Sequence, residues 1–473
     1  MTRFRLAAGA LALAPALCLL ASGDVRAQSP QPSPEDPPRA ASGDAPADTP
    51  QQPPAEQASE AMDSAESVES AETTEDAGLA FGFSGNLDAF VSHYTVGDAP
   101  LSNPGNLIAQ LPTRQLDVVF RPKFTLEADS VRAWLGPRIA LTESRALGRR
   151  ERADEIYVQE AGVAYSPTDH VTIVAERTIM LWGPSLFSSP SNPFFASSNQ
   201  SNPFVELNPR DFVRVRYAPD DRWAFSAIGN VRLGRDTDEY GDFRRISALG
   251  VEHTGEMHSL NLVLARRGDL DHVGLFGQWT ANDALLLYAD VGHRTRTAAR
   301  SVVRDVASPS GWRVQARGDR DEFDALIGAS YTNAGGDTLT LEFRHNSQGL
   351  DDREFDDLRD AAADYLRAAT DPASIADAAR FFAETSDLGS RSLRRNYLHA
   401  QYLIREITPR VGGNVLALYG LDDGSAQWIG VLNWYVTDES RISLNAVFGS
   451  GPRDGEFRRF FDTAVFLGYK HYF

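Results

Sequence analysis

Apolar and polar residues alternate over many short segments of this chain, and this period of two restricts its fold more than any other feature. The segment 115–128 shows the pattern most clearly. Its apolar positions are Leu116, Val118, Phe120, Pro122, Phe124 and Leu126, and its polar positions include Asp117, Arg121, Lys123, Thr125 and Glu127. Because successive side chains of a β-strand point to opposite faces, we expect a strand with one apolar and one polar face.

The same pattern recurs from residue 78 to the end of the chain and predicts eighteen strands. We expect them at residues 81–94, 115–128, 131–142, 156–166, 170–178, 212–218, 223–231, 244–253, 259–266, 272–280, 284–294, 322–332, 337–347, 395–404, 410–420, 426–436, 440–449 and 462–473. Connections after even-numbered strands are short and rich in Gly, Pro, Asn and Asp, which favour turns, whereas the others are mostly longer. We therefore predict an all-β fold, a transmembrane antiparallel β-barrel of about 18 strands (16–18), over residues 78–473.

The composition is compatible with such a barrel and excludes two other classes of protein. Of the 473 residues, 42% are hydrophobic and 23% charged, and the formal net charge is −19. Outside the first two dozen residues there is no run of roughly 18 apolar residues, which excludes a helical membrane protein. The acidity argues against nucleic acid as a partner, because nucleic-acid binding requires a basic surface.

The N-terminal 77 residues differ from the rest and divide into two segments. Residues 1–27 have the features of a secretory signal peptide: Arg3 and Arg5, an apolar stretch, and Val25-Arg26-Ala27 as the cleavage site. This segment contains Cys18, the only cysteine of the chain. Residues 28–77 hold nine prolines and twelve acidic residues against Arg39 alone. We predict that they form a disordered acidic segment in the periplasm.

The chain ends on an alternating strand whose last residue is aromatic. Val465, Leu467, Tyr469 and Phe473 share one face of this strand. Such an ending resembles the assembly signal of Gram-negative outer-membrane β-barrels, and the large barrel as a whole resembles porins. The resemblance implies an outer-membrane location, recognition of Phe473 by the barrel-assembly machinery, and contact with outer-membrane lipid and lipopolysaccharide. The sequence leaves the oligomeric state open.

A barrel of this size encloses an aqueous lumen unless loops fill it, so its inward-facing charges matter for function. The expected pore-lining residues are Arg121, Lys123, Arg132, Arg138, Arg214, Arg216, Asp117, Glu127 and Glu342. They predict passive passage of small hydrophilic solutes, anionic ones included, without a cofactor. The alternative interpretation is a wall of salt bridges that holds the barrel in shape.

Two connections have unusual sequences. Residues 179–211 contain repeated Ser-Asn-Pro-Phe and resemble the in-folding constriction loop of porins, with Trp182, Asn192, Phe194, Asn202, Phe204 and Arg210 as candidate residues. An outer loop packed on the barrel rim is the alternative. Residues 348–394 show helical spacing of apolar residues and predict a helical extracellular insert, with a lumenal plug as the alternative.

Two further functions have weaker support in the sequence. Export of an acidic polysaccharide, as in alginate-export barrels, would require a wide and strongly basic lumen. The His345/Ser347 pair resembles the catalytic pair of outer-membrane lipid hydrolases, with Glu354 or Asp360 as candidates to orient the imidazole. We expect that the protein is not an enzyme. We also expect no metal site, because the calcium-like motif that begins at Asp236 has Ser247 at the twelfth position, where a calcium-binding loop has glutamate.

Overall fold

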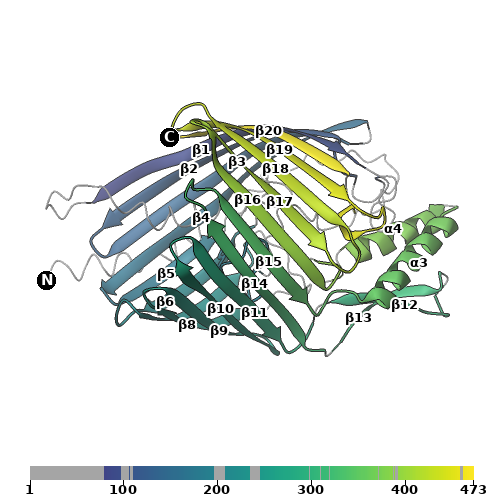
Figure 1. Cartoon of the computed structure of the whole chain (residues 1–473), viewed down its shortest axis with the longest axis horizontal. Coiled ribbons are helices and arrows are strands. Elements are labelled where there is room, and N and C mark those ends of the chain that lie inside the picture. Colours follow the sequence, from purple (N-terminus) through teal and green to yellow (C-terminus); the bar gives the residue numbers. More distant parts are fainter. Residues whose placement is uncertain are drawn as a thin grey trace, which may run out of the picture.

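The eighteen expected strands form one closed antiparallel barrel in the computed structural model (Figure 1). The structure describes residues 79–96, 106, 110–146, 148–195, 208–234, 245–297, 299–308, 310–318, 320–370, 372–386, 388, 392–458 and 462–473. The expected signal peptide, the acidic segment 28–77, Asn202, Phe204 and the motif at Asp236 lie outside these residues.

Each barrel strand pairs with its neighbours in the chain, and the first also pairs with the last, which closes the cylinder. The barrel strands are β1 (Ala80–Thr95), β2 (Arg114–Ala128), β3 (Val131–Ala146), β4 (Arg149–Thr168), β5 (Val171–Thr178), β6 (Arg210–Tyr217), β7 (Trp223–Arg232), β8 (Ile246–Thr254), β9 (His258–Arg267), β10 (Leu270–Asn282), β11 (Leu285–Arg294), β14 (Glu322–Thr332), β15 (Thr338–Asn346), β16 (Asn396–Thr408), β17 (Val411–Gly420), β18 (Ala426–Tyr435), β19 (Ser440–Ser450) and β20 (Thr463–Tyr472). The predicted fold class is confirmed.

The alternation determines which face of each strand points outward. On β2, Leu116, Phe124 and Leu126 are exposed on the outer surface, whereas Asp117 and Val119 are buried on the inner side. An apolar exterior and a polar interior are what a membrane-spanning barrel requires. The period of two therefore sets the environment of each side chain along the strand.

The terminal phenylalanine lies on the seam where the barrel closes. Its backbone exchanges hydrogen bonds with Gly85 of β1, at 3.0 and 3.1 Å. Its ring stacks on Phe120 and packs against Phe83, with centroid distances of 5.8 and 5.5 Å. A Cβ atom on Gly85 would lie 2.7 Å from this ring, so the glycine makes room for Phe473.

The two ends of the barrel differ. At one end, tight turns join β2–β3, β4–β5, β6–β7 and the five corresponding pairs that follow, and we call this the short-turn end. In the β6–β7 turn, Asp220 accepts the backbone N–H groups of Arg222 and Trp223, which lowers the pKa of this carboxyl. The other end carries the longer connections, and we call it the long-loop end.

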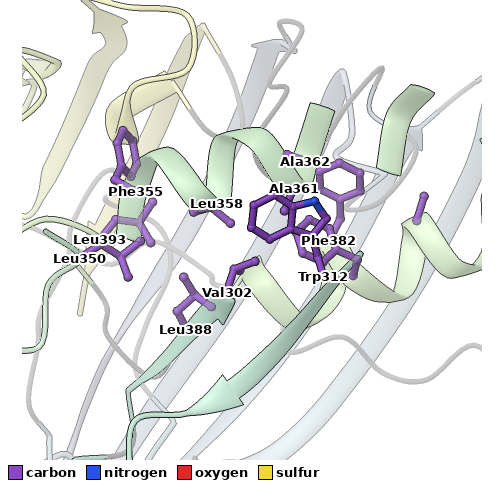
Figure 2. Packing of buried hydrophobic residues seen from close by; sticks show 12 residues of the cluster. Val302, Trp312, Leu350, Phe355, Leu358, Ala361, Ala362, Phe382, Leu388 and Leu393 are labelled. Carbon is purple, nitrogen blue, oxygen red and sulfur yellow. The ribbon is translucent and has the colours of Figure 1, made fainter. Parts of the chain in front are cut away.

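A small cap projects beyond the long-loop end (Figure 1). It combines the hairpin β12 (Arg300–Arg304) and β13 (Trp312–Ala316) with the helices α3 (Asp352–Ala368) and α4 (Pro372–Ser386). Figure 2 shows its core, in which Trp312 lies with Phe382 and Ala361. The predicted helical insert is confirmed, but the hairpin was not predicted. Neither helix is long and apolar enough to cross a membrane.

Candidate functional site: the barrel interior and the β5–β6 loop

The loop that follows β5 enters the barrel and packs first against the inner side of β6 to β9. Met180, Phe194 and Phe195 of the loop form one buried apolar cluster with inward-facing residues of these strands. The wall residues of the cluster are Phe212, Ile228, Ile246, Ala248, Val263 and Ala265. The loop is therefore anchored to β6–β9 twice, at Met180 and again at Phe194 and Phe195.

Asn192 and the aromatic residues around it fix the local shape of the loop. The Asn192 side chain donates to the carbonyl of Met180 (2.9 Å) and accepts the N–H groups of Phe194 (2.9 Å) and Phe195 (3.0 Å). Trp182 packs edge-on against Phe194, with 5.6 Å between ring centroids. The guanidinium of Arg210 lies over the Phe195 ring at 4.7 Å. The structure thus brings together Trp182, Asn192, Phe194 and Arg210 of the sequence-predicted set.

The middle of the loop is bound to β10 and β11 through polar contacts. Asp290, a fully buried carboxylate, accepts hydrogen bonds from Ser189 Oγ (3.1 Å) and from the backbone N–H of Ser191 (2.7 Å). His272 Nε2 lies 2.9 Å from the Ser191 carbonyl. A Cβ atom on Gly292 would overlap the carbonyl oxygen of Pro190, so the loop backbone lies directly on β11. A glycine is required wherever two backbones approach this closely.

The tip of the loop reaches the opposite wall. The backbone N–H of Leu186 donates to Glu342 Oε1 of β15 (2.7 Å). Phe187 packs edge-on against His399, with 4.8 Å between centroids, and enters a buried apolar cluster on β17 to β20. Glu342 is itself held by Tyr288 (2.8 Å) and His399 (3.2 Å). Glu342, expected from the sequence to line the pore, therefore lies buried beneath the loop.

We call the inward-facing residues of β10, β11 and β14 to β20 the covered arc. Many of its polar side chains are almost completely buried, for example Gln401 at 5% and Asn445 at 1% exposure, whereas Gln278 and Thr280 near the short-turn end are exposed. The inner face of β17 to β19 carries Leu416, Leu418, Ile429 and Val447, which interrupt the alternation because both faces of these strands are apolar. This interruption is the signal in the sequence that could have revealed a covering segment.

The six predicted basic residues lie on the remaining part of the wall, and each forms an ion pair with a carboxylate of another strand. The pairs are Arg121–Asp88, Lys123–Glu160 (3.2 Å), Arg132–Glu127 (3.0 Å), Arg138–Glu155 (3.8 Å), Arg214–Glu176 (3.3 Å) and Arg216–Glu252 (3.5 Å). We call these twelve residues, on β1 to β6 and β8, the charged arc. Asp117 is different, because its hydrogen bonds come from Thr142 (2.6 Å) and Gln115 (2.8 Å).

Three pairs of the charged arc, Lys123–Glu160, Arg132–Glu127 and Arg216–Glu252, are open to solvent, whereas Arg121 and Asp88 are only 15% and 12% exposed. The side chains of Arg132 and Glu127 are 38% and 54% exposed, and those of Arg216 and Glu252 are 48% and 41% exposed. Exposed pairs contribute little to stability, about 0–1 kcal/mol each. These ion pairs nevertheless determine the electrostatic potential along the inner wall. Because each basic side chain has an acidic one beside it, this potential alternates in sign.

The His345/Ser347 pair is not arranged as a nucleophile and its base. His345 Nδ1 lies 2.9 Å from Asn396 Oδ1, and Ser347 Oγ accepts the backbone N–H of Phe323 (2.8 Å). Within the described residues no hydrogen bond joins His345 to Ser347. The two expected orienting residues are engaged elsewhere, Glu354 with Arg317 (2.6 Å) and Asp360 with Arg304 (3.6 Å). The suggested roles of Glu354 and Asp360 are therefore wrong.

The part of the chain that the structure describes contains no group of three or more His, Cys, Asp or Glu side chains suited to a metal ion.

No family model matches the chain, and no curated protein matches it. Among solved structures it is similar to OccK7 (OpdD) of Pseudomonas aeruginosa, with 14% identity over 84% of this chain and 99% of that one and a TM-score of 0.46.

Two further solved structures are similar at a comparable level. OccAB3 of Acinetobacter baumannii has 11% identity over 83% of this chain and 99% of its own, with a TM-score of 0.46. A triple mutant of the Rhodopseudomonas blastica porin has 12% identity over 83% and 100%, with a TM-score of 0.41. The chain forms a closed antiparallel β-barrel. The pairing of the strands shows this fold directly, because eighteen antiparallel strands close into one cylinder.

Proposed function

We propose that this barrel is a passive channel for small hydrophilic solutes and that the solutes move along the charged arc. The observation that carries the proposal is the asymmetry of the interior. The β5–β6 loop lies against one side of the wall and buries it, while the exposed ion pairs line the other side. A solute inside the barrel therefore meets the charged arc on one side and the loop on the other, so the loop acts as the constriction.

The balance of charge on the arc supports weak selectivity with a modest preference for anionic or polyhydroxylated solutes. Paired bases and acids offer hydrogen bonds to hydroxyl groups without strongly attracting either sign of charge. At the long-loop end, the charged residues that line a hollow between Phe194 and the wall are four arginines and one acid: Arg210, Arg266, Arg267, Arg294 and Asp271. Glu322 pairs with Arg294 at 3.3 Å. These arginines supply the modest preference for anions that we propose.

The orientation and location that we propose follow porin architecture. The long-loop end and its cap face the exterior, and the short-turn end, with the acidic segment 28–77, faces the periplasm. We further propose that the barrel-assembly machinery recognises Phe473, whose ring is accessible on the outer surface at 42% exposure. The surrounding partners are outer-membrane lipid and lipopolysaccharide, and no catalytic activity is proposed.

Liposome swelling with sugars and organic acids of graded size tests this function. We expect swelling with small sugars that declines with solute size, and a reversal potential in a salt gradient that is slightly anion-selective. A lack of swelling would contradict the channel, and a cation-selective potential would contradict the proposed solute preference.

Neither alternative function gains support from the described residues. A polysaccharide exporter would need a wide, strongly basic lumen, but the loop crosses the interior and every base of the charged arc has an acidic neighbour. A lipid hydrolase would need His345 beside Ser347, and these side chains are engaged with other residues.

A further inference from the structure

Four basic residues form a single row on the outer surface at the long-loop end of β1 to β4. The strand register pairs His93 with Arg114, Arg114 with Arg145, and Arg145 with Arg150. All four side chains are exposed, and they point away from the barrel interior because they alternate with inward-facing residues such as Ser92 and Gln115. Residues directly opposite in a sheet have Cβ atoms about 5 Å apart.

The row lies at the upper edge of the apolar outer band. Val91 and Leu116 are the next outward-facing residues on β1 and β2, and both are exposed apolar side chains. Two residues along a strand correspond to about 7 Å. On β1 and β2 the bases therefore lie immediately above the apolar layer, at the level where a lipid leaflet presents its headgroups. On β3 and β4 the charged residues Glu143 and Arg152 come next, and exposed apolar residues begin again at Leu141 and Ile156.

The charge of this row is only partly neutralised by the protein. Glu143 pairs with Arg150 at 2.5 Å. Arg114 and Arg145, in contrast, have no acidic partner among the described residues, although like charges placed directly opposite destabilise a sheet. Elsewhere on the same rim the outward-facing Arg266 has Asp271 beside it at 3.0 Å. The β1–β4 row thus contains two adjacent arginines without an acidic partner among the described residues, whereas Arg266 has one.

We infer that the row formed by His93, Arg114, Arg145 and Arg150 binds the phosphate groups of the glycolipid in the outer leaflet. Arginine binds phosphate oxygens through paired N–H donors, and an anion between Arg114 and Arg145 removes their mutual repulsion. The acyl chains of the same lipid would lie on Val91 and Leu116 below. The inference rests on the proposed orientation of the barrel, and not on its function as a channel.

Native mass spectrometry of the detergent-purified barrel with diphosphorylated lipid A tests this inference. Each arginine near an anionic membrane surface contributes roughly 1 kcal/mol, so the double variant R114Q/R145Q should bind lipid A on the order of thirty-fold more weakly than the unmodified protein. R266Q is the matched control on the same rim and should bind as the unmodified protein does. Heat-dependent mobility on a denaturing gel verifies that each barrel is folded.

Three results would overturn the inference. Equal binding of lipid A by R114Q/R145Q and the unmodified protein would show that the row is not the site. Equal binding of dephosphorylated lipid A would show that phosphate is not recognised. Complete competition by millimolar inorganic phosphate would identify a general anion site instead of a lipid site. None of these outcomes bears on conductance, so failure here is distinguishable from failure of the channel.

Discussion

The covered arc and the charged arc are inner faces of the same barrel, yet they use polar residues in opposite ways. Beneath the loop, buried groups such as Asp290 and Glu342 are satisfied by hydroxyl and backbone N–H donors of the loop itself. On the open side, Arg132 and Arg216 meet carboxylates at solvent-exposed positions. Burial requires specific hydrogen bonds, whereas an aqueous surface tolerates exposed ion pairs. The difference indicates which side of the interior water and solutes reach.

The largest effect should come from lifting the loop off the covered arc. In Gly292→Val the new side chain must displace the loop backbone at Pro190, so we expect single-channel conductance to increase several-fold. Gly430→Val on β18 is the matched control, since a Cβ atom there has no neighbour within 4 Å. Unchanged conductance in folded Gly292→Val would contradict the account of the loop.

Charge reversal on the charged arc should alter selectivity without altering the size of the channel. We expect Arg132→Glu combined with Arg216→Glu to shift the reversal potential clearly toward cation selectivity, because both positions change from positive to negative beside an existing acid. Arg152→Glu makes the same change on the outward face of β4, where Arg152 lies 3.2 Å from Asp154, and should leave the reversal potential where it was. Equal shifts from both would show that the arc does not line the path.

Phe187→Ala tests the anchor at the tip of the loop. Removing a buried phenylalanine costs about 3–5 kcal/mol when the cavity cannot collapse. Because the contacts of Asp290 and Glu342 remain, we expect the loop to detach transiently, seen as rapid conductance fluctuations in single-channel recordings. Quiet recordings at the original conductance would indicate that Phe187 does not hold the tip.

The smallest effect on the channel should come from the cap. Leu358 is almost completely buried between the cap elements, so Leu358→Ala should destabilise the cap by about 2–5 kcal/mol. Limited proteolysis should then cleave the cap faster, while conductance should stay constant because the cap lies beyond the barrel end. A large change in conductance would show that the cap also controls the opening.

The sequence predicted all eighteen barrel strands because alternation is a local property that each segment carries by itself. The packing of the β5–β6 loop was less predictable, since it depends on contacts such as Leu186 with Glu342, which are 156 positions apart. The β12–β13 hairpin was missed because strands of five residues give too short a pattern. The contact of His345 with Asn396 depends on the register between β15 and β16, and no local pattern of residues indicates it.

Site-directed thiol modification tests most directly whether solutes follow the charged arc. Cys18 is the only cysteine of the chain, so in protein produced without residues 1–27 an introduced cysteine is the sole target. Glu160 of the charged arc has a 45% exposed side chain, and Asn445 of the covered arc is 1% exposed. A charged methanethiosulfonate reagent should reduce the conductance of Glu160→Cys and leave Asn445→Cys unchanged. The reverse pattern would contradict the account.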